Sequence, residues 1–193
     1  MSKPRILAFG GSLRRGSFNQ KLAAIAAEGA RKAGAEVTLI CLSDFPLPLF
    51  DQDLEDREGM PEAGRKLKQL FLEHDGLIIA SPEYNSSITG ALKNAIDWVS
   101  RTEIDDEPAL AAYKGKTAVL CSASPGGLGG LRGLVHVRAI LGNIGVTVLP
   151  EQVAVSKAHE AFNDDGTLKD EKLGAQVKNL GSQLAKHLAK MLA

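Results

Sequence analysis

Residue types that bind anions gather in one short stretch near the N-terminus. Residues 10–19 read GGSLRRGSFN and lie between the apolar run RILAF and a helix-like run that begins at Gln20. Backbone N–H groups at a helix start, together with hydroxyl, amide and guanidinium side chains, form a binding site for a phosphate. The side chains that we expect to contact it are Ser12, Arg14, Ser17 and Asn19. The alternative is that one of these residues only caps the helix.

The spacing within this first loop narrows the choice of phosphate. Gly11 and Gly16 fit the motif GxxxxGK[ST], but Ser17 stands where that motif requires the Lys that reaches the β- and γ-phosphates. An NTPase is therefore not expected. The GxGxxG fingerprint of a dinucleotide site does not occur in the sequence. A low-molecular-weight phosphatase needs a nucleophilic Cys in its first loop, and this loop contains none. The ligand of the first loop that remains is a compact phosphate monoester.

Two further loops have a ligand-binding composition. The second loop, residues 81–90, reads SPEYNSSITG, where Tyr84 can pack against a flat ligand and Asn85 can bond its polar edge. The third loop, residues 122–130, reads SASPGGLGG, and its glycines let the backbone approach a ligand closely. Taken alone, each loop can equally be a structural turn. Together the three loops describe a site for a mononucleotide with a large planar base, and FMN fits.

The elements that must position these loops alternate along the chain. Short runs rich in Ile, Leu and Val predict strands that are covered on both faces, as in a parallel sheet. They lie at residues 5–9, 36–42, 76–81, 117–122 and within 146–155. Helical periodicity lies between and after them. The apolar stripes of the five predicted helices include Leu22, Leu67, Leu92, Leu134 and Leu173.

Five strands and five helices predict a three-layer α/β sandwich, with a parallel sheet covered by helices on both faces. We expect one domain, residues 1–193, and the strand order 2-1-3-4-5. A complete dinucleotide-binding domain would usually have six strands. Ligands bind at the carboxyl ends of such strands, near the point where the winding reverses, which here lies between strands 1 and 3. The three loops are therefore expected to meet there.

Composition excludes several classes of protein. The 193 residues are 44% hydrophobic and 24% charged, and 23 basic residues balance 23 acidic ones. This neutral charge gives no sign of a nucleic-acid partner or an anionic membrane. The sequence has no residue spacing typical of a metal site and no pattern typical of a signal peptide. It also has no apolar run as long as a membrane span. Cys41 and Cys121 lie in apolar runs and are interpreted as buried strand thiols, so the cytoplasm is the expected location.

A few positions outside the loops invite specific interpretations. Trp98 is either a core residue or a dimer contact near the ligand. Residues 43–58 are expected to form an ordered acidic surface loop, and Asn163–Gly166 a turn. The histidines are expected at the surface or at an interface, with none of them catalytic. They are His74, His136, His159 and His187.

At this point the chain resembles a known family, the NADPH-dependent FMN reductases, which include bacterial quinone and chromate reductases. The motifs that carry the resemblance are GSLRRGSFN at residues 11–19 and PEYNSSITGALKNAIDW at residues 82–98. It spans about residues 4 to 155. It implies a flavodoxin-like fold, bound FMN, and homodimers that often pair into homotetramers.

The resemblance also assigns residues and a reaction. It places the FMN phosphate on Ser12, Arg14, Ser17 and Asn19, with Leu13 and Phe18 in the same loop. The flavin ring would be lined by Pro82, Glu83, Tyr84 and Asn85, and the third loop would contribute Ser122, Ser124 and Gly126. NADPH or NADH would reduce the flavin in a ping-pong reaction. A small-molecule acceptor would then oxidise it: a quinone, chromate, a ferric complex, an azo compound or free flavin.

Two other functions share the same cofactor. A non-enzymatic electron carrier of the flavodoxin type is usually strongly acidic, whereas this chain is neutral. A flavin-dependent sensor or docking module would keep the site without turnover. In the enzyme, no side chain is needed as a catalytic acid or base, because the cofactor carries the chemistry.

Overall fold

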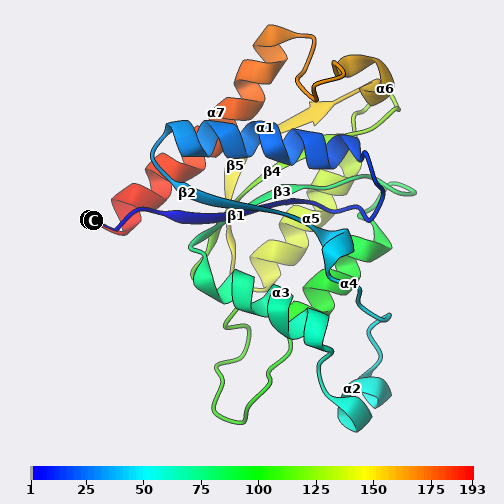
Figure 1. Cartoon of the computed structure of the whole chain (residues 1–193), viewed down its shortest axis with the longest axis vertical. Coiled ribbons are helices and arrows are strands. Elements are labelled where there is room, and N and C mark those ends of the chain that lie inside the picture. The colour runs from blue at the N-terminus through cyan, green and yellow to red at the C-terminus, as the bar shows by residue number, and fades with distance from the viewer. Residues whose placement is uncertain (1) are drawn as a thin grey trace.

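The computed structural model describes residues 2–193, and within them five parallel strands form one sheet between two helical layers (Figure 1). The strand order β2-β1-β3-β4-β5 confirms the predicted order. Gly10 pairs with both Cys41 and Ala80, so the carboxyl ends of three strands are aligned. The strands are β1 (Arg5–Gly10), β2 (Glu36–Cys41), β3 (Gly76–Ala80), β4 (Thr117–Ala123) and β5 (Thr147–Val155).

Long helices cover both faces of the sheet, as the sequence predicts. One face carries α1 (Phe18–Lys32) and α7 (Glu171–Met191) (Figure 1). The other carries α3 (Glu62–Glu73), α4 (Gly90–Val99) and α5 (Leu131–Asn143). Because successive strand side chains point to opposite faces, each central strand contributes side chains to two separate hydrophobic cores, one on each face of the sheet. In β1, Ile6 and Ala8 pack under α1 and α7, whereas Leu7 and Phe9 pack over the other three helices.

The expectation of strands covered on both faces is correct for the centre of the sheet and wrong for its edges. Every residue of β3 and β4 is buried. In β2 the residues are partly or fully exposed, since an edge strand has a neighbour on one side only. Cys121 is therefore a fully buried thiol, as predicted, whereas Cys41 is only half-buried. Burial raises the pKa of Cys121 to about 12, so this thiol stays protonated.

Two short helices that the sequence did not predict overlap residues 43–58, the segment expected as an acidic surface loop. They are η1 (Leu42–Asp44) and α2 (Gln52–Glu58), and Asp51 caps the second of them by accepting from the backbone N–H of Asp53 at 2.9 Å. Trp98 of α4 anchors the stretch between them. Its ring is fully buried, and its Nε1 donates to the carbonyl of Pro48 at 2.8 Å. The core interpretation of Trp98 is confirmed.

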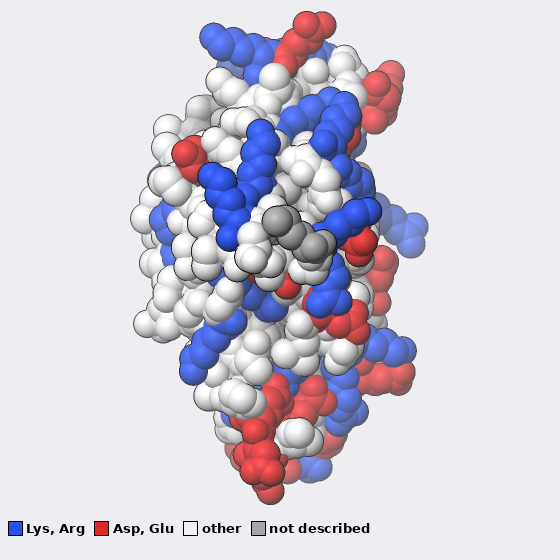
Figure 2. All heavy atoms as spheres, turned by 90° about the vertical axis from the view of Figure 1, so that its left-hand side faces the viewer, with Lys and Arg blue, Asp and Glu red and all other residues white. Residues whose placement is uncertain are grey.

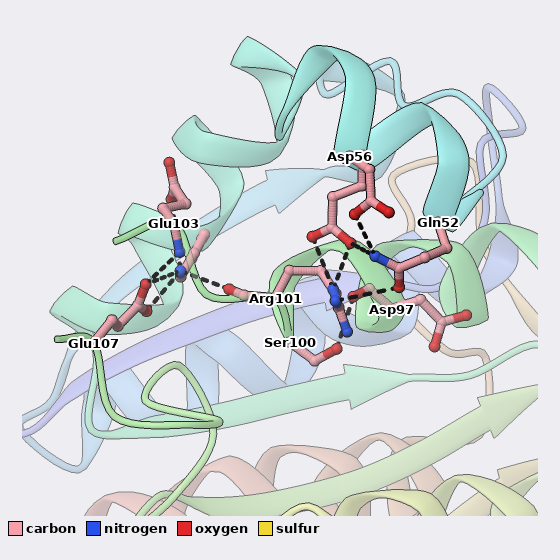
Figure 3. Close-up of polar contacts among 9 residues, drawn as sticks. Gln52, Asp56, Asp97, Ser100, Arg101, Glu103 and Glu107 are labelled. Atoms are coloured by element: carbon pink, nitrogen blue, oxygen red, sulfur yellow. Dashed lines mark hydrogen bonds and ion pairs between the residues drawn. The ribbon is translucent and has the colours of Figure 1, made fainter. Parts of the chain in front are cut away.

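Two ionic networks attach α2 and residues 102–109 to the rest of the protein (Figure 3). Arg101 donates its Nε to both carboxylate oxygens of Glu55, at 2.8 and 2.9 Å, and so holds α2. Lys68 of α3 is only 2% exposed, and its Nζ donates to Glu107 and to the carbonyl of Arg101, each at 2.7 Å. A buried charge of this kind needs its partners. Residues 102–109 are thus fastened over the end of α4.

His74 contradicts the expectation that the histidines lie at the surface or an interface. It is 7% exposed, its Nδ1 lies 2.6 Å from the carbonyl of Leu70, and its Nε2 lies 2.8 Å from the Thr38 hydroxyl. The reason is its place in the chain, since α3 ends there and the backbone enters the central strand β3. The predicted turn at Asn163–Gly166 is confirmed by a bond from the Gly166 N–H to the Asn163 carbonyl. The sequence did not predict α6 (Ala158–Ala161) just before it.

Charge is unevenly spread although the chain is neutral. Figure 2 shows Lys and Arg side chains over the upper and middle parts of one face and Asp and Glu gathered at its lower end. Figure 1 places residues 102–109 at that end. Within residues 2–193, no helix is long and apolar enough to cross a membrane.

Candidate functional site

A cleft of about 230 Å³ opens where the first, second and third loops meet, beyond the carboxyl ends of β1, β3 and β4. Nine of the predicted site residues line it: Ser12, Arg14, Ser17, Phe18, Asn19, Pro82, Glu83, Tyr84 and Ser124. Ala123 and Pro125 line it as well and were not singled out from the sequence. Leu13, Asn85, Ser122 and Gly126 lie outside this lining.

The start of α1 provides the anion-binding end of the cleft. Ser17 occupies the N-cap position, is 3% exposed, and its hydroxyl makes no capping bond to the helix. Among residues 2–193, no acceptor takes the first three helical N–H groups, those of Phe18, Asn19 and Gln20. Such N–H groups attract an anion, and the helix dipole adds to their effect. The geometry therefore favours a phosphate at this point.

Arg14 adds a full positive charge beside the helix start. Its guanidinium is exposed and lies 5.2 Å from the centroid of the Phe18 ring, measured to Cζ. Within the described part of the chain it forms no ion pair. The Ser12 hydroxyl accepts from the backbone N–H of Arg14 at 3.1 Å and so fixes the turn that carries the Arg14 side chain. The charge of Arg14 remains available to a ligand.

Asn19 has a structural partner that the sequence did not reveal. Its Nδ2 donates to the Ala123 carbonyl at 2.8 Å, and its Oδ1 accepts from the Ala123 N–H at 2.9 Å. The side chain is 3% exposed and closes a two-bond contact between α1 and the end of β4. Its main role in this structure is to join the first loop to the third, and one N–H of its amide is left for a ligand.

Two more side chains hold the first loop in place, and sequence reasoning missed both roles. The Thr89 hydroxyl donates to the Gly11 carbonyl at 2.5 Å and accepts from the Leu92 N–H at 3.1 Å. It thus caps α4 while it joins the first and second loops. Gln20 accepts from the Gly10 N–H at 2.9 Å and donates to the Ile40 carbonyl at 2.8 Å. A Thr directly before a helix is a recognisable capping signal, whereas the reach of Gln20 is not.

The second loop makes a tight turn that displays an aromatic ring. Tyr84 and Ser87 exchange two backbone hydrogen bonds of 2.9 and 3.0 Å around Asn85 and Ser86. Both central residues have positive φ, 50° and 67°, which is the geometry of a type I′ turn. Asn is among the residues that tolerate it best. Tyr84 is 56% exposed at the mouth of the cleft, and Asn85 lies at the exposed tip of the turn.

Glu83 binds the start of α5 and so attaches the second loop to the third. Its carboxylate accepts from the backbone N–H groups of Arg132 and Gly133, at 3.1 and 3.2 Å, and pairs with the Arg132 guanidinium. Burial alone raises the pKa of Glu83, but these hydrogen bonds and the Arg132 charge outweigh it and hold the pKa below its usual range. The carboxylate is therefore ionised at neutral pH and engaged with the protein.

The third loop depends on a glycine where it meets β4. Gly130 has φ +89°, and a Cβ there would lie 1.9 Å from the Ser122 hydroxyl oxygen. Ser122 is fully buried beneath this glycine, and its Oγ has no hydrogen-bond partner among the described residues. Gly126 donates to the Ser124 hydroxyl at 3.3 Å. Ser122 therefore supports the loop from below, whereas Ser124 faces the cleft.

Leu13 points to a different cavity from the one expected for it. It is 56% exposed and lines an apolar space of about 450 Å³ together with Leu42, Phe45, Leu67 and Ala95. That cavity lies between the segment after β2 and the helices α3 and α4. The first loop thus separates a polar cleft from an apolar one.

Comparisons with known proteins identify the family that this chain resembles. The sequence profile of the NADPH-dependent FMN reductases matches residues 4–160. A quinone reductase of Escherichia coli is 37% identical over 139 residues, which cover 72% of this chain and 70% of that protein. An NAD(P)H-dependent FMN reductase of Pseudomonas aeruginosa is 36% identical over 169 residues, which cover 87% and 86%. The solved flavoenzyme FerB, an NAD(P)H:(acceptor) oxidoreductase from Paracoccus denitrificans, aligns over 98% of both chains with a TM-score of 0.78 at 27% identity.

Proposed function

The chain belongs to the NADPH-dependent FMN reductase family, and from that premise we propose that the three-loop cleft is its FMN site and that quinones are among its electron acceptors. The chain is an oxidoreductase, and FMN and NAD(P)H are the cofactors of its family. The observation that carries the proposal is the convergence of nine predicted site residues on one cleft. We take residues 1–193 as a single FMN-binding domain.

The residues of the cleft fit FMN at both ends. Arg14, the free N–H groups at the start of α1 and the unpaired hydroxyl of Ser17 suit a phosphate monoester. The exposed ring of Tyr84 stands at the open end, where a flat ring system can pack. When bound, FMN supplies two-electron transfer between NAD(P)H and the acceptor. The side chains bind and orient the cofactor, and we assign no acid or base among them.

The third loop is proposed to supply hydrogen-bond donors. The N–H groups of Gly127 and Leu128 have no acceptor within residues 2–193. Donors placed beside the flavin N1 and O2 atoms would stabilise the negative charge of the reduced ring. A crystal structure of the FMN complex tests this assignment. Contacts of roughly 2.7–3.2 Å support it, whereas separations above about 4 Å overturn it.

Spectroscopy of the purified protein tests the cofactor directly. Bound flavin gives absorbance bands near roughly 370 and 450 nm. A protein that stays colourless when FMN is added overturns the proposal. Oxidation of NADPH and NADH, with and without 1,4-benzoquinone, then separates the enzyme from a flavin-bound carrier or sensor, which shows no turnover. Chromate, ferric complexes, azo compounds and free flavin are further proposed acceptors for the same assay.

Arg14→Ala tests the phosphate end of the cleft. Loss of a charge-assisted contact is expected to weaken FMN retention roughly tenfold, with the fold unchanged because Arg14 is exposed. Fluorescence titration of the apoprotein with FMN measures the affinity. Arg57→Ala, a change at an exposed arginine on α2, is the matched control. Equal FMN affinity in the Arg14 variant and the wild type refutes this role.

We further propose a homodimer or homotetramer that acts in the cytoplasm. Two large apolar side chains are strongly exposed. Leu49 follows Pro48, which lines the apolar cavity, and is 81% exposed, and Ile104, within residues 102–109, is 69% exposed. Burial of such side chains between two copies of the chain would favour association. Both cysteines are free, which is usual in a reducing compartment. Light scattering at two protein concentrations tests the oligomer, and a monomer at both concentrations contradicts it.

A further inference from the structure

We propose that a second hollow, adjoining the FMN cleft, binds the 2′-phosphate of NADPH and that Arg15 and Lys21 thereby favour NADPH over NADH. The hollow has a volume of about 260 Å³, and we call it the basic hollow. Ser12, Arg14 and Ser17 line both spaces, so the two share one wall. The inference rests on the proposed function, since it concerns the electron donor of the same site.

The charges that line the basic hollow are all positive. Arg14, Arg15 and Lys21 line it, and within residues 2–193 none of them forms an ion pair. Two carboxylates lie near its edges without lining it. Asp44 follows Ser43, which lines the hollow, and Asp165 interacts electrostatically with Lys21. Three cations around one small space leave a positive charge that an anion can balance.

The positive charges that line the hollow exceed what a single phosphate would balance. A phosphate monoester carries roughly −1.5 to −2 at neutral pH. Arg14 and the start of α1 together match the phosphate of FMN. Arg15 and Lys21 then remain. Lys21 also interacts with Asp165, and its Nζ lies 5.8 Å from the centre of the Phe162 ring, so Arg15 carries the larger share of the attraction for a second phosphate monoester. The 2′-phosphate of NADPH is such a group, and it is the feature that distinguishes NADPH from NADH.

Polar side chains line the hollow beside the cations, and one of them, Gln20, is fixed by two hydrogen bonds. Ser17 is 3% exposed, lines the hollow and has no side-chain capping partner. Ser17 stands on the wall that the hollow shares with the FMN cleft, where its hydroxyl can donate to a ligand oxygen. Gln20 is held by bonds of 2.9 and 2.8 Å to Gly10 and Ile40, so it provides a rigid wall. The hydroxyls of Ser12 and Ser43 also line the hollow.

The experiment uses the FMN-bound protein and a nucleotide probe without a nicotinamide. Isothermal titration calorimetry compares 2′,5′-ADP, which carries the 2′-phosphate, with 5′-AMP and with inorganic phosphate. The wild type is expected to bind 2′,5′-ADP at least about tenfold more tightly than 5′-AMP. The double variant Arg15→Gln/Lys21→Gln is expected to abolish that preference. Arg57→Gln/Lys172→Gln, at exposed positions on α2 and α7, is the matched control.

Steady-state kinetics provides the second readout. In the double variant, kcat/KM for NADPH is expected to fall about tenfold or more, whereas kcat/KM for NADH and the FMN content stay within about twofold. Equal loss for both nucleotides, or unchanged binding of 2′,5′-ADP, overturns the proposal. Loss of FMN from the variant also overturns it, because the hollow would then hold the FMN phosphate. Inorganic phosphate that binds as tightly as 2′,5′-ADP overturns the NADPH assignment. An inactive wild type refutes the proposed function, while the calorimetry still decides the subsite.

Discussion

Asn19→Ala gives the sharpest test of how the cleft is assembled. Asn19 makes two hydrogen bonds, of 2.8 and 2.9 Å, to the backbone of Ala123. The variant leaves the N–H and the C=O of Ala123 without partners, and Ala123 is only 4% exposed. Each unsatisfied buried group costs about 1–3 kcal/mol, so the sum is about 2–6 kcal/mol. Water can enter from the adjoining cleft, so we expect about 2–4 kcal/mol.

Urea unfolding of the apoprotein measures this cost without the added stability of bound FMN. With a denaturant slope of about 2 kcal/mol per molar urea, the midpoint is expected to fall by about 1–2 M. Asn19→Asp keeps the acceptor but replaces the donor to Ala123, so it should also be less stable. Asn179→Ala, at an exposed site on α7, is the control and should change stability by less than about 0.5 kcal/mol.

The alternative for Asn19 is direct binding of the FMN phosphate. In that case Asn19→Ala would reduce FMN affinity while the urea midpoint of the apoprotein stayed within error of the wild type. That combination would refute the structural role. A lower midpoint together with weaker FMN binding agrees with our reasoning, because the first and third loops would no longer be held together.

Three further predictions concern other contacts of the structure. Gly130→Ala should destabilise the apoprotein by about 1–3 kcal/mol and weaken FMN binding, because the new Cβ would meet Ser122 at a positive φ; a thermal midpoint equal to the wild type contradicts this. Glu83→Gln should be less stable than the wild type at pH 7, and the difference should shrink as the pH falls below 4.5. The pKa of Glu83 in the folded protein lies below 4.5, its value in the unfolded chain. The ionised carboxylate therefore stabilises the fold above pH 4.5, and this stabilisation is lost as the pH falls through the folded pKa. A difference in urea midpoint that does not change with pH would show that the charge plays no part. Lys68→Met should cost about 3–5 kcal/mol, since it leaves Glu107 without its cationic partner; limited proteolysis should then cut residues 102–109 faster, and an unchanged pattern would count against the network.

Local patterns in the sequence determined the layout of the fold and the place of the site. Apolar strand runs and helical stripes predicted five alternating strand and helix units. The number of units then favoured the order β2-β1-β3-β4-β5, which the structure confirms. Loop composition predicted where the ligand-binding loops lie, because phosphate loops and tight turns depend on residues that are neighbours in the chain. The short helix α2 was missed because its seven residues are acidic and bury none of their side chains, so it has no apolar stripe.

Contacts between residues far apart in the sequence were decided only by the tertiary structure. Asn19 and Ala123 are 104 positions apart, and nothing in the local pattern indicates that the Asn19 amide binds the backbone of β4. Likewise, the motif of the second loop predicts that Glu83 faces a ligand, yet its carboxylate binds the start of α5. A side chain's type sets which bonds it can make, but packing decides which partner comes within reach. The sequence by itself thus determined where the cleft lies, and the tertiary structure decided which side chains hold it together and which face a ligand.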